Sequence, residues 1–262
     1  MPITISKSKY MAGVQCLKRL YWQVHEPELA GVPDAAAVAI LEQGREVGRL
    51  ARQLFAGGLE VRAGDSEQAI RITRELIANP EVPAIFEAAF EDGGVFVRVD
   101  ILQRRRDGRW RLVEVKSTAD LKEQYLDDVA IQHRVVSRCG LDLASSCLMH
   151  VNRNYAFQGG SIDVRRFFKI RNLTQRIERL QPKLTFQLRS ELRVLVMPAQ
   201  CWCSANNWLK RSMSSLRGMN EDFDRGRRST IAGADNRAIT DSRPHFCLTL
   251  GKLFLSHFGY RQ

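Results

Sequence analysis

The sequence predicts an α/β (α+β) fold in which helices pack around a mixed β-sheet. The spacing of apolar residues changes along the chain from the three-to-four-residue period of a helix to the two-residue period of a strand, and then back. Glycine-containing turns separate the alternating segments. The chain has 262 residues, of which 44% are apolar and 26% charged, so disordered and collagen-like classes are excluded.

Two amphipathic helices are expected first. In residues 35–55 apolar side chains recur three or four positions apart, and Asp34 precedes them in the position of a helix cap. A second helical pattern begins at Asp65 or Ser66 and is closed by Pro80. Both helices therefore precede the strand-like segments.

Three strands in a meander follow. Residues 85–90 have the pattern of a short strand and are followed by a turn at 92–94. Residues 95–102 alternate, an Asp-Gly turn at 107–108 reverses the chain, and residues 110–117 alternate again. Because the turns are short, neighbouring strands are expected to be antiparallel.

A crossover helix completes the predicted core. We expect it over residues 121–138, with Gly140 as its stop, before a further strand over 143–151. The order helix, strand, strand, strand, helix, strand returns the last strand parallel to a neighbour. A long basic amphipathic helix is predicted over 177–195, bent or broken at Pro182.

The chain divides into a folded domain over residues 1–197 and a basic tail over 198–262. The apolar period fades after Met197, so we interpret the tail as irregular, or as a truncated or out-of-frame remnant. The tail has 10 basic and 5 acidic residues and thus contributes +5 of the net charge of +11. So large a positive charge points to a polyanionic partner.

The compartment expected is the cytoplasm, without a membrane partner. No run approaches the roughly 18 apolar residues of a membrane span, and lysines interrupt the first fifteen residues, where a secretory leader would be apolar. Six cysteines in a chain of this length are too sparse for a secreted disulfide scaffold. Reduced thiols are expected, with a bound metal or cluster still open.

Two acidic side chains and one lysine are expected to converge on neighbouring strands. Glu114 and Lys116 lie two residues apart, so they leave the same face of a strand. If the turn at 107–108 joins two antiparallel strands, the numbers of directly opposed residues should sum to about 215. Asp100 is then opposite about Val115 and within one residue of the position opposite Glu114.

These three residues have the chemistry of a magnesium-dependent phosphodiester hydrolase. The residues flanking Glu114 are apolar, and burying carboxylates costs several kcal/mol unless a cation compensates them. Carboxylate oxygens are the ligands that Mg²⁺ prefers, the ion lowers the pKa of bound water, and a lysine can stabilise charge on the phosphate.

The sequence resembles the PD-(D/E)XK nuclease superfamily, in its RecB-like and CRISPR-associated exonuclease branch. The resemblance is carried by VDIL at 99–102, WRLVEVKS at 110–117 and DVAIQ at 128–132. The segment SKSKYMAGVQCLKRLYW at 6–22 is similar to an uncharacterised bacterial group in that branch. The resemblance covers about residues 3–197 and implies a restriction-endonuclease-like core.

The resemblance also implies roles for particular residues. Asp100 and Glu114 would be ligands of Mg or Mn, Lys116 the catalytic lysine, and Gln132 a helix glutamine that orients the lysine or the scissile phosphate. The substrate implied is nucleic acid, DNA rather than RNA.

The pattern of the branch is incomplete at two positions. Its active exonucleases have a histidine ligand where this chain has Gly48, and a tyrosine where this chain has Val136. A third ligand is therefore sought in Glu46 or Glu87, or in water.

An iron-sulfur cluster is a further possibility that the resemblance raises. Cys16, Cys201, Cys203 and Cys247 would be its four ligands. However, the 43 residues between Cys203 and Cys247 do not match the compact trio of the pattern, which favours unligated thiols over a cluster or zinc.

Three functions follow for the chain. The leading hypothesis is a metal-dependent nuclease acting on DNA. The second is a catalytically degraded module of the same fold that binds nucleic acid without turnover. The third is an interaction or structural protein whose positive charge is incidental.

Overall fold

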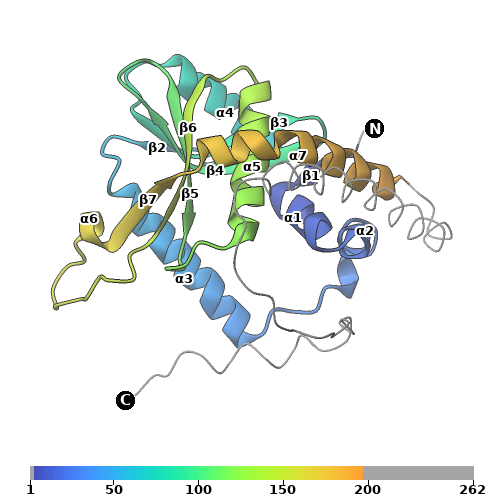
Figure 1. Cartoon of the computed structure of the whole chain (residues 1–262), viewed down its shortest axis with the longest axis horizontal. Coiled ribbons are helices and arrows are strands. Elements are labelled where there is room, and N and C mark those ends of the chain that lie inside the picture. The colour runs from blue at the N-terminus through green and yellow to red at the C-terminus, as the bar shows by residue number, and fades with distance from the viewer. Residues whose placement is uncertain (1–2, 197–262) are drawn as a thin grey trace, which may run out of the picture. The chain divides into compact units, whose positions relative to one another are not determined.

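The computed structural model describes residues 3–196, which form a mixed seven-stranded sheet between two layers of helices (Figure 1). The predicted tail, and with it Cys201, Cys203 and Cys247, lies outside these residues. The strands are β1 (Ile5–Ser6), β2 (Leu59–Glu60), β3 (Ala84–Asp92), β4 (Val95–Arg104), β5 (Trp110–Lys116), β6 (Leu143–Val151) and β7 (Phe168–Asn172). The helices are α1 (Lys7–Gln15), α2 (Leu17–His25), the short 3₁₀ helix η1 (Pro27–Leu29), α3 (Ala35–Arg52), α4 (Ser66–Ala78), α5 (Glu123–Arg138), α6 (Val164–Phe167) and α7 (Thr174–Leu195).

The predicted order of the core elements is confirmed. Helix α4, strands β3, β4 and β5, helix α5 and strand β6 follow one another in the chain. The strand order in the sheet is β2-β3-β4-β5-β6-β7, with β1 paired to β4. Strands β3, β4 and β5 are antiparallel, and the α5 crossover returns β6 parallel to β5.

Local sequence explains where the helices begin and end. The Asp34 side chain accepts a hydrogen bond from the Ala37 amide at the start of α3, and Asp65 does the same for Gln68 at the start of α4. Helix α5 is followed by Gly140, whose φ of 86° is in the left-handed region that favours glycine.

The core has two layers, one on each face of the sheet. Buried residues of α4, α5 and α7 pack on one face together with Tyr10 of α1, whereas α3 packs on the other face through Val47 and Ala51 (Figure 1). No helix within residues 3–196 combines the length and the apolar character needed to cross a membrane.

Strands β3 and β4 change their alternation at one level of the sheet. In β4, Val97 and Val99 pack on the α5 face, yet the even-numbered Leu102 packs there too, so the pattern shifts at Asp100. Glu87 has a φ of 57°, and the β3–β4 pairing omits Glu87 and Asp100. This local irregularity frees the Asp100 side chain from the ordinary up-or-down alternation.

The expected break in the last helix is not found. Helix α7 runs continuously through Pro182, so a break at this proline is wrong. Buried side chains on both sides of the proline, Ile177 before it and Leu184 and Leu188 after it, pack into the same core. This burial offsets the missing backbone hydrogen bond.

Candidate functional site

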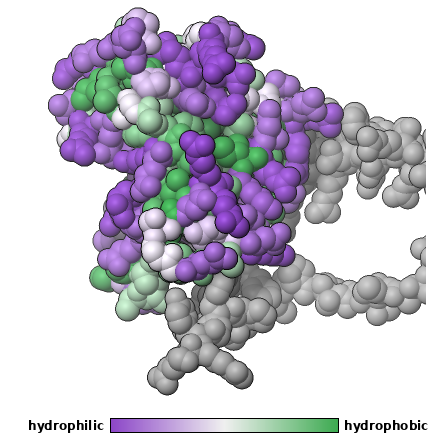
Figure 2. Space-filling model, turned by 90° about the vertical axis from the view of Figure 1, so that its left-hand side faces the viewer, coloured by the Kyte–Doolittle hydropathy of each residue, from purple (hydrophilic) through white to green (hydrophobic). Residues whose placement is uncertain are grey.

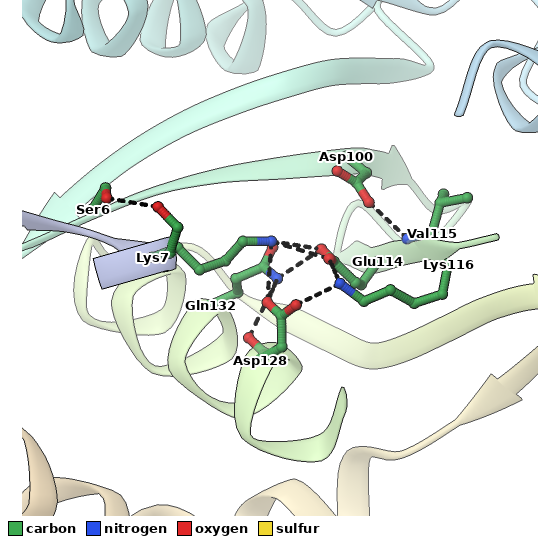
Figure 3. Close-up of polar contacts among 9 residues, drawn as sticks. Ser6, Lys7, Asp100, Glu114, Val115, Lys116, Asp128 and Gln132 are labelled. Carbon is green, nitrogen blue, oxygen red and sulfur yellow. Dashed lines mark hydrogen bonds and ion pairs between the residues drawn. The ribbon is translucent and has the colours of Figure 1, made fainter. Parts of the chain in front are cut away.

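Glu114 of β5 is the centre of a buried cluster of charged side chains (Figure 3). Its residue is only 2% exposed, and its carboxylate points from the sheet toward α5. Oε1 accepts hydrogen bonds from Lys116 Nζ at 2.6 Å and Lys7 Nζ at 3.0 Å, and Oε2 accepts from Gln132 Nε2 at 2.7 Å. Every oxygen of this carboxylate is therefore paired.

Helix α5 supplies two further members of the cluster. Asp128 and Gln132 lie four residues apart, so they share one helix face, and both are buried. Gln132 Nε2 donates to Asp128 Oδ1 at 2.9 Å as well as to Glu114. The amide thus orients two carboxylates, and within residues 3–196 the side-chain hydrogen bonds of Gln132 go to Glu114 and Asp128 and not to Lys116.

Two lysines neutralise the carboxylates. Lys116 Nζ lies 2.6 Å from Glu114 Oε1 and from Asp128 Oδ2, and Lys7 Nζ lies 3.0 Å from Glu114 and from Asp128 Oδ1. Burial lowers the pKa of each lysine, but Glu114 and Asp128 outweigh it and raise the pKa of both above the usual range. Both lysines are therefore ammonium ions at neutral pH.

Asp100 reaches the cluster from β4. The β4–β5 pairing ends at Ile101 and Val113, and Asp100 Oδ2 accepts a hydrogen bond from the Val115 amide at 2.7 Å in place of a backbone oxygen. Burial raises the pKa of Asp100, although the charge of Lys7 and the Val115 hydrogen bond lower it. In the observed β4–β5 register, the numbers of paired residues sum to 214. If the same register is continued, Asp100 lies opposite Glu114, which differs by one residue from the predicted sum of about 215.

The two glutamates considered as third ligands lie in different surroundings. Glu46 is exposed on α3 and pairs with Arg49 at 2.6 Å, so the expectation that it joins the site is wrong. Glu87 pairs with Arg52 at 2.8 Å, and its charge contributes to the raised pKa of Asp100. Glu87 is therefore a neighbour of Asp100, held by an arginine.

The donors suit a hard divalent cation in kind, but they are arranged around ammonium groups. Asp100 and Glu114 offer carboxylate oxygens, and Asp100 Oδ1 has no hydrogen-bond partner among residues 3–196. In the same part of the chain, no three His, Cys, Asp or Glu side chains are grouped as a metal site. Lys7 Nζ lies 3.0 Å from both Glu114 and Asp128, so an ammonium group balances these two carboxylates.

The cysteine expectation is not decided by the described residues. Cys16, at the junction of α1 and α2, is an exposed free thiol. The other three cysteines of the implied cluster lie beyond residue 196. The iron-sulfur cluster stays a prediction.

Two members of the cluster were missed as site residues. Asp128 lies in the DVAIQ segment, and its spacing of four from Gln132 was a usable signal on a helix. Lys7 is 107 residues from Glu114, and its contact depends on β1 pairing beside β4, which places the start of α1 over the site. A two-residue strand leaves no period in the sequence.

Comparisons with known proteins give little guidance. No family model and no curated protein matches the chain. Among solved structures, the one titled "Crystal structure of SSO0001" is similar with a TM-score of 0.36 and 13% identity, covering 71% of this chain and 77% of that chain. The chemistry of the site must therefore be inferred from its own residues.

Proposed function

We propose that this protein is a metal-dependent nuclease that hydrolyses phosphodiester bonds of DNA. The observation that carries the proposal is the convergence of Asp100, Glu114 and Lys116 from adjacent strands. Asp100 and Glu114 would hold Mg²⁺ or Mn²⁺, which supplies an activated water and neutralises phosphate charge. The resemblance of these segments to PD-(D/E)XK nucleases supports the same assignment.

Lys116 has the position and charge to meet a phosphate. Its side chain is 23% exposed, whereas that of Glu114 is 3% exposed, so Lys116 is more open to solvent than the carboxylate it contacts. Glu114 and Asp128 keep it protonated and fix its position. A fixed ammonium stabilises the negative charge that develops on the phosphate oxygens.

Asp128 and Gln132 act as positioning residues. Gln132 is fully buried and ties Glu114 to Asp128, and Asp128 in turn holds Lys116. Because the side chains come from a helix packed on the sheet, the geometry is fixed before substrate binds.

The net charge of +11 supports nucleic acid as the partner. The three cysteines within residues 3–196 are free thiols, which supports a reducing compartment, and we place the protein in the cytoplasm.

The second candidate is a nucleic-acid-binding module without turnover. It is favoured by Lys7, which already balances the two carboxylates that a metal would need to draw on. In this case, the cluster is a structural ion network and the basic surface alone binds phosphates.

The deciding experiment measures cleavage of fluorescent single- and double-stranded DNA in Mg²⁺ and in Mn²⁺. We expect Glu114→Gln and Lys116→Met to lower the rate by roughly 100-fold or more, because each removes a charge from the reacting centre. Glu46→Gln is the matched control, since Glu46 is exposed on α3 and outside the cluster. If the unaltered protein binds DNA in a salt-sensitive manner yet cleaves none of it, the second candidate replaces the first.

A further inference from the structure

A second cluster of cationic side chains lies at the opposite end of β5. The turn between β4 and β5 and its flanks contain five arginines and a single acidic residue, Asp107. Arg109 pairs with Asp107 at 2.9 Å, and Arg104 donates to backbone oxygens and covers the Trp110 ring. By contrast, the Arg111 side chain is in no ion pair within residues 3–196, and its buried Nε has no hydrogen-bond partner there.

Two adjoining clefts open beside these arginines. The first, of about 330 Å³, is lined by Arg105, Arg109, Arg111, Ser145, Cys147 and Asn172, together with Ala144 and Ile170. The second, of about 350 Å³, shares Arg105 and Arg111 with the first and is also lined by Gln103, Arg104, Arg106 and the acidic Asp107, which is paired with Arg109 and Arg105. We call this pair of clefts the arginine cleft.

The arginine cleft gathers buried polar atoms that lack a hydrogen bond of good geometry. Within residues 3–196, eight buried side-chain nitrogen or oxygen atoms lack a hydrogen bond, and four of them line these clefts. They are Arg111 Nε, Gln103 Oε1, Arg105 Nε and Ser145 Oγ; of these, Arg105 Nε lies 3.8 Å from Asp107 Oδ1 in a long ion pair, and Ser145 Oγ neighbours the Cys147 thiol. Three of the four groups can donate, and an unpaired buried donor costs about 1–3 kcal/mol, so a ligand that accepts hydrogen bonds is expected there.

Among the residues of the arginine cleft, Ser145 is a buried hydroxyl beside the arginines. The residue is 6% exposed, and its hydroxyl lies at the wall of the cleft without a partner of good geometry. Arg111 is paired with Ser145 across β5 and β6, so the two side chains leave the same face of the sheet at neighbouring positions and both line the cleft. The charges of Arg111 and Arg105 also act on the neighbouring Cys147 thiol.

The arginine cleft is separate from the Glu114 cluster. Val113 and Cys147 pack on the α3 face of the sheet, and Arg111 has the same parity as Val113, whereas Glu114 points to the α5 face. Three residues of strand separate Arg111 from Glu114, about 10 Å along β5. The side of the molecule that carries β7 and α6 is largely hydrophilic (Figure 2).

We propose that the arginine cleft is a binding site for a phosphate group, held by Arg111, Arg105 and Ser145. Two guanidinium groups and a hydroxyl supply planar and single donors that match phosphate oxygens. The group can belong to a free nucleotide or to a nucleic-acid backbone, which present the same oxyanion. The site stands whether or not the Glu114 cluster cleaves DNA.

Calorimetric titration of the full chain with AMP and with inorganic phosphate tests the proposal. We expect saturable binding that Arg111→Met and Ser145→Ala each weaken by about tenfold or more, because each loses a charge-assisted hydrogen bond. Arg71→Met is the matched control, since Arg71 is an exposed arginine on α4 paired only within its helix. Glu114→Gln should bind as the unaltered protein does, which separates this site from the proposed nuclease centre.

The reactivity of Cys147, which lines the arginine cleft, gives a second measurement of ligand binding. Alkylation of Cys147, resolved by mass spectrometry of its peptide, should slow when AMP is bound, whereas exposed Cys16 should react unchanged. Competition of a single-stranded oligonucleotide with AMP identifies a backbone phosphate as the ligand, and AMP binding without competition identifies a free nucleotide. Equal affinity of all variants, or no binding of any probe, overturns the proposal.

Discussion

Replacing Glu191 by glutamine should change how stability depends on pH. Glu191 of α7 is fully buried, and neither carboxylate oxygen has a hydrogen bond of good geometry within residues 3–196. Gly13 makes room for it, because a Cβ at that position would lie 2.6 Å from the carboxyl carbon. Burial raises the pKa of Glu191 from 4.5 to about 9, only slightly opposed by Gln187.

The direction of the pH dependence of stability follows from proton binding by Glu191. Between pH 4.5 and 9 the folded protein keeps a proton on Glu191 that the unfolded chain releases, so unfolding becomes easier as pH rises. The stability that depends on protonated Glu191 is fully present below pH 4.5 and is lost progressively as the pH rises to 9. Each pH unit in this window corresponds to about 1.4 kcal/mol, or about 4 kcal/mol between pH 5 and 8.

Urea unfolding followed by circular dichroism at several pH values measures this effect. Glu191→Gln cannot ionise, so the difference in unfolding free energy between variant and unaltered protein should grow in favour of the variant from pH 5 to 8. Glu178→Gln, an exposed position on the same helix, should show no such trend. A difference for Glu191→Gln that stays constant with pH would refute the reasoning.

Two further changes test the site and the core. Lys7→Met should strengthen Mn²⁺ binding by about tenfold, ~1.4 kcal/mol, because it removes the ammonium between Glu114 and Asp128; calorimetry with unchanged affinity would show that Lys7 does not compete with a cation. Thr73→Val should destabilise the protein by about 1–3 kcal/mol, because the buried Ala89 amide loses its acceptor, and Thr73→Ser should recover most of the loss in urea unfolding.

The central sheet was predictable because its signals are local. Turns at 92–94 and 107–108 fix strand ends, and alternating valines fix the strands between them. The same turn placed Asp100 within one residue of its observed level beside Glu114. The face of the sheet to which each side chain points was harder to predict from the sequence. The change in alternation at Asp100 and Glu87 depends on how β3 and β4 pair with each other, which neither strand reveals alone.

The elements at the edges of the fold have weaker sequence signals than the central strands. Strand β7 has only Phe168 buried, so no alternation marks it, and β1 and β2 are two residues long. Helix α1 mixes small, polar and aromatic residues without an apolar stripe, although Tyr10 and Ala12 are buried by neighbours. Such elements are defined by contacts with distant segments, which a single sequence does not display.

The way Lys7 enters the charged cluster has a practical consequence for anyone producing the protein. The lysine follows directly after β1, whose Ile5 amide donates a hydrogen bond to the Gly94 oxygen, so residues 5 and 6 are held in the sheet. A purification tag fused directly before β1 would lie within a few residues of the cluster. Trimming that end back past the lysine would remove one strand and one cation in a single step.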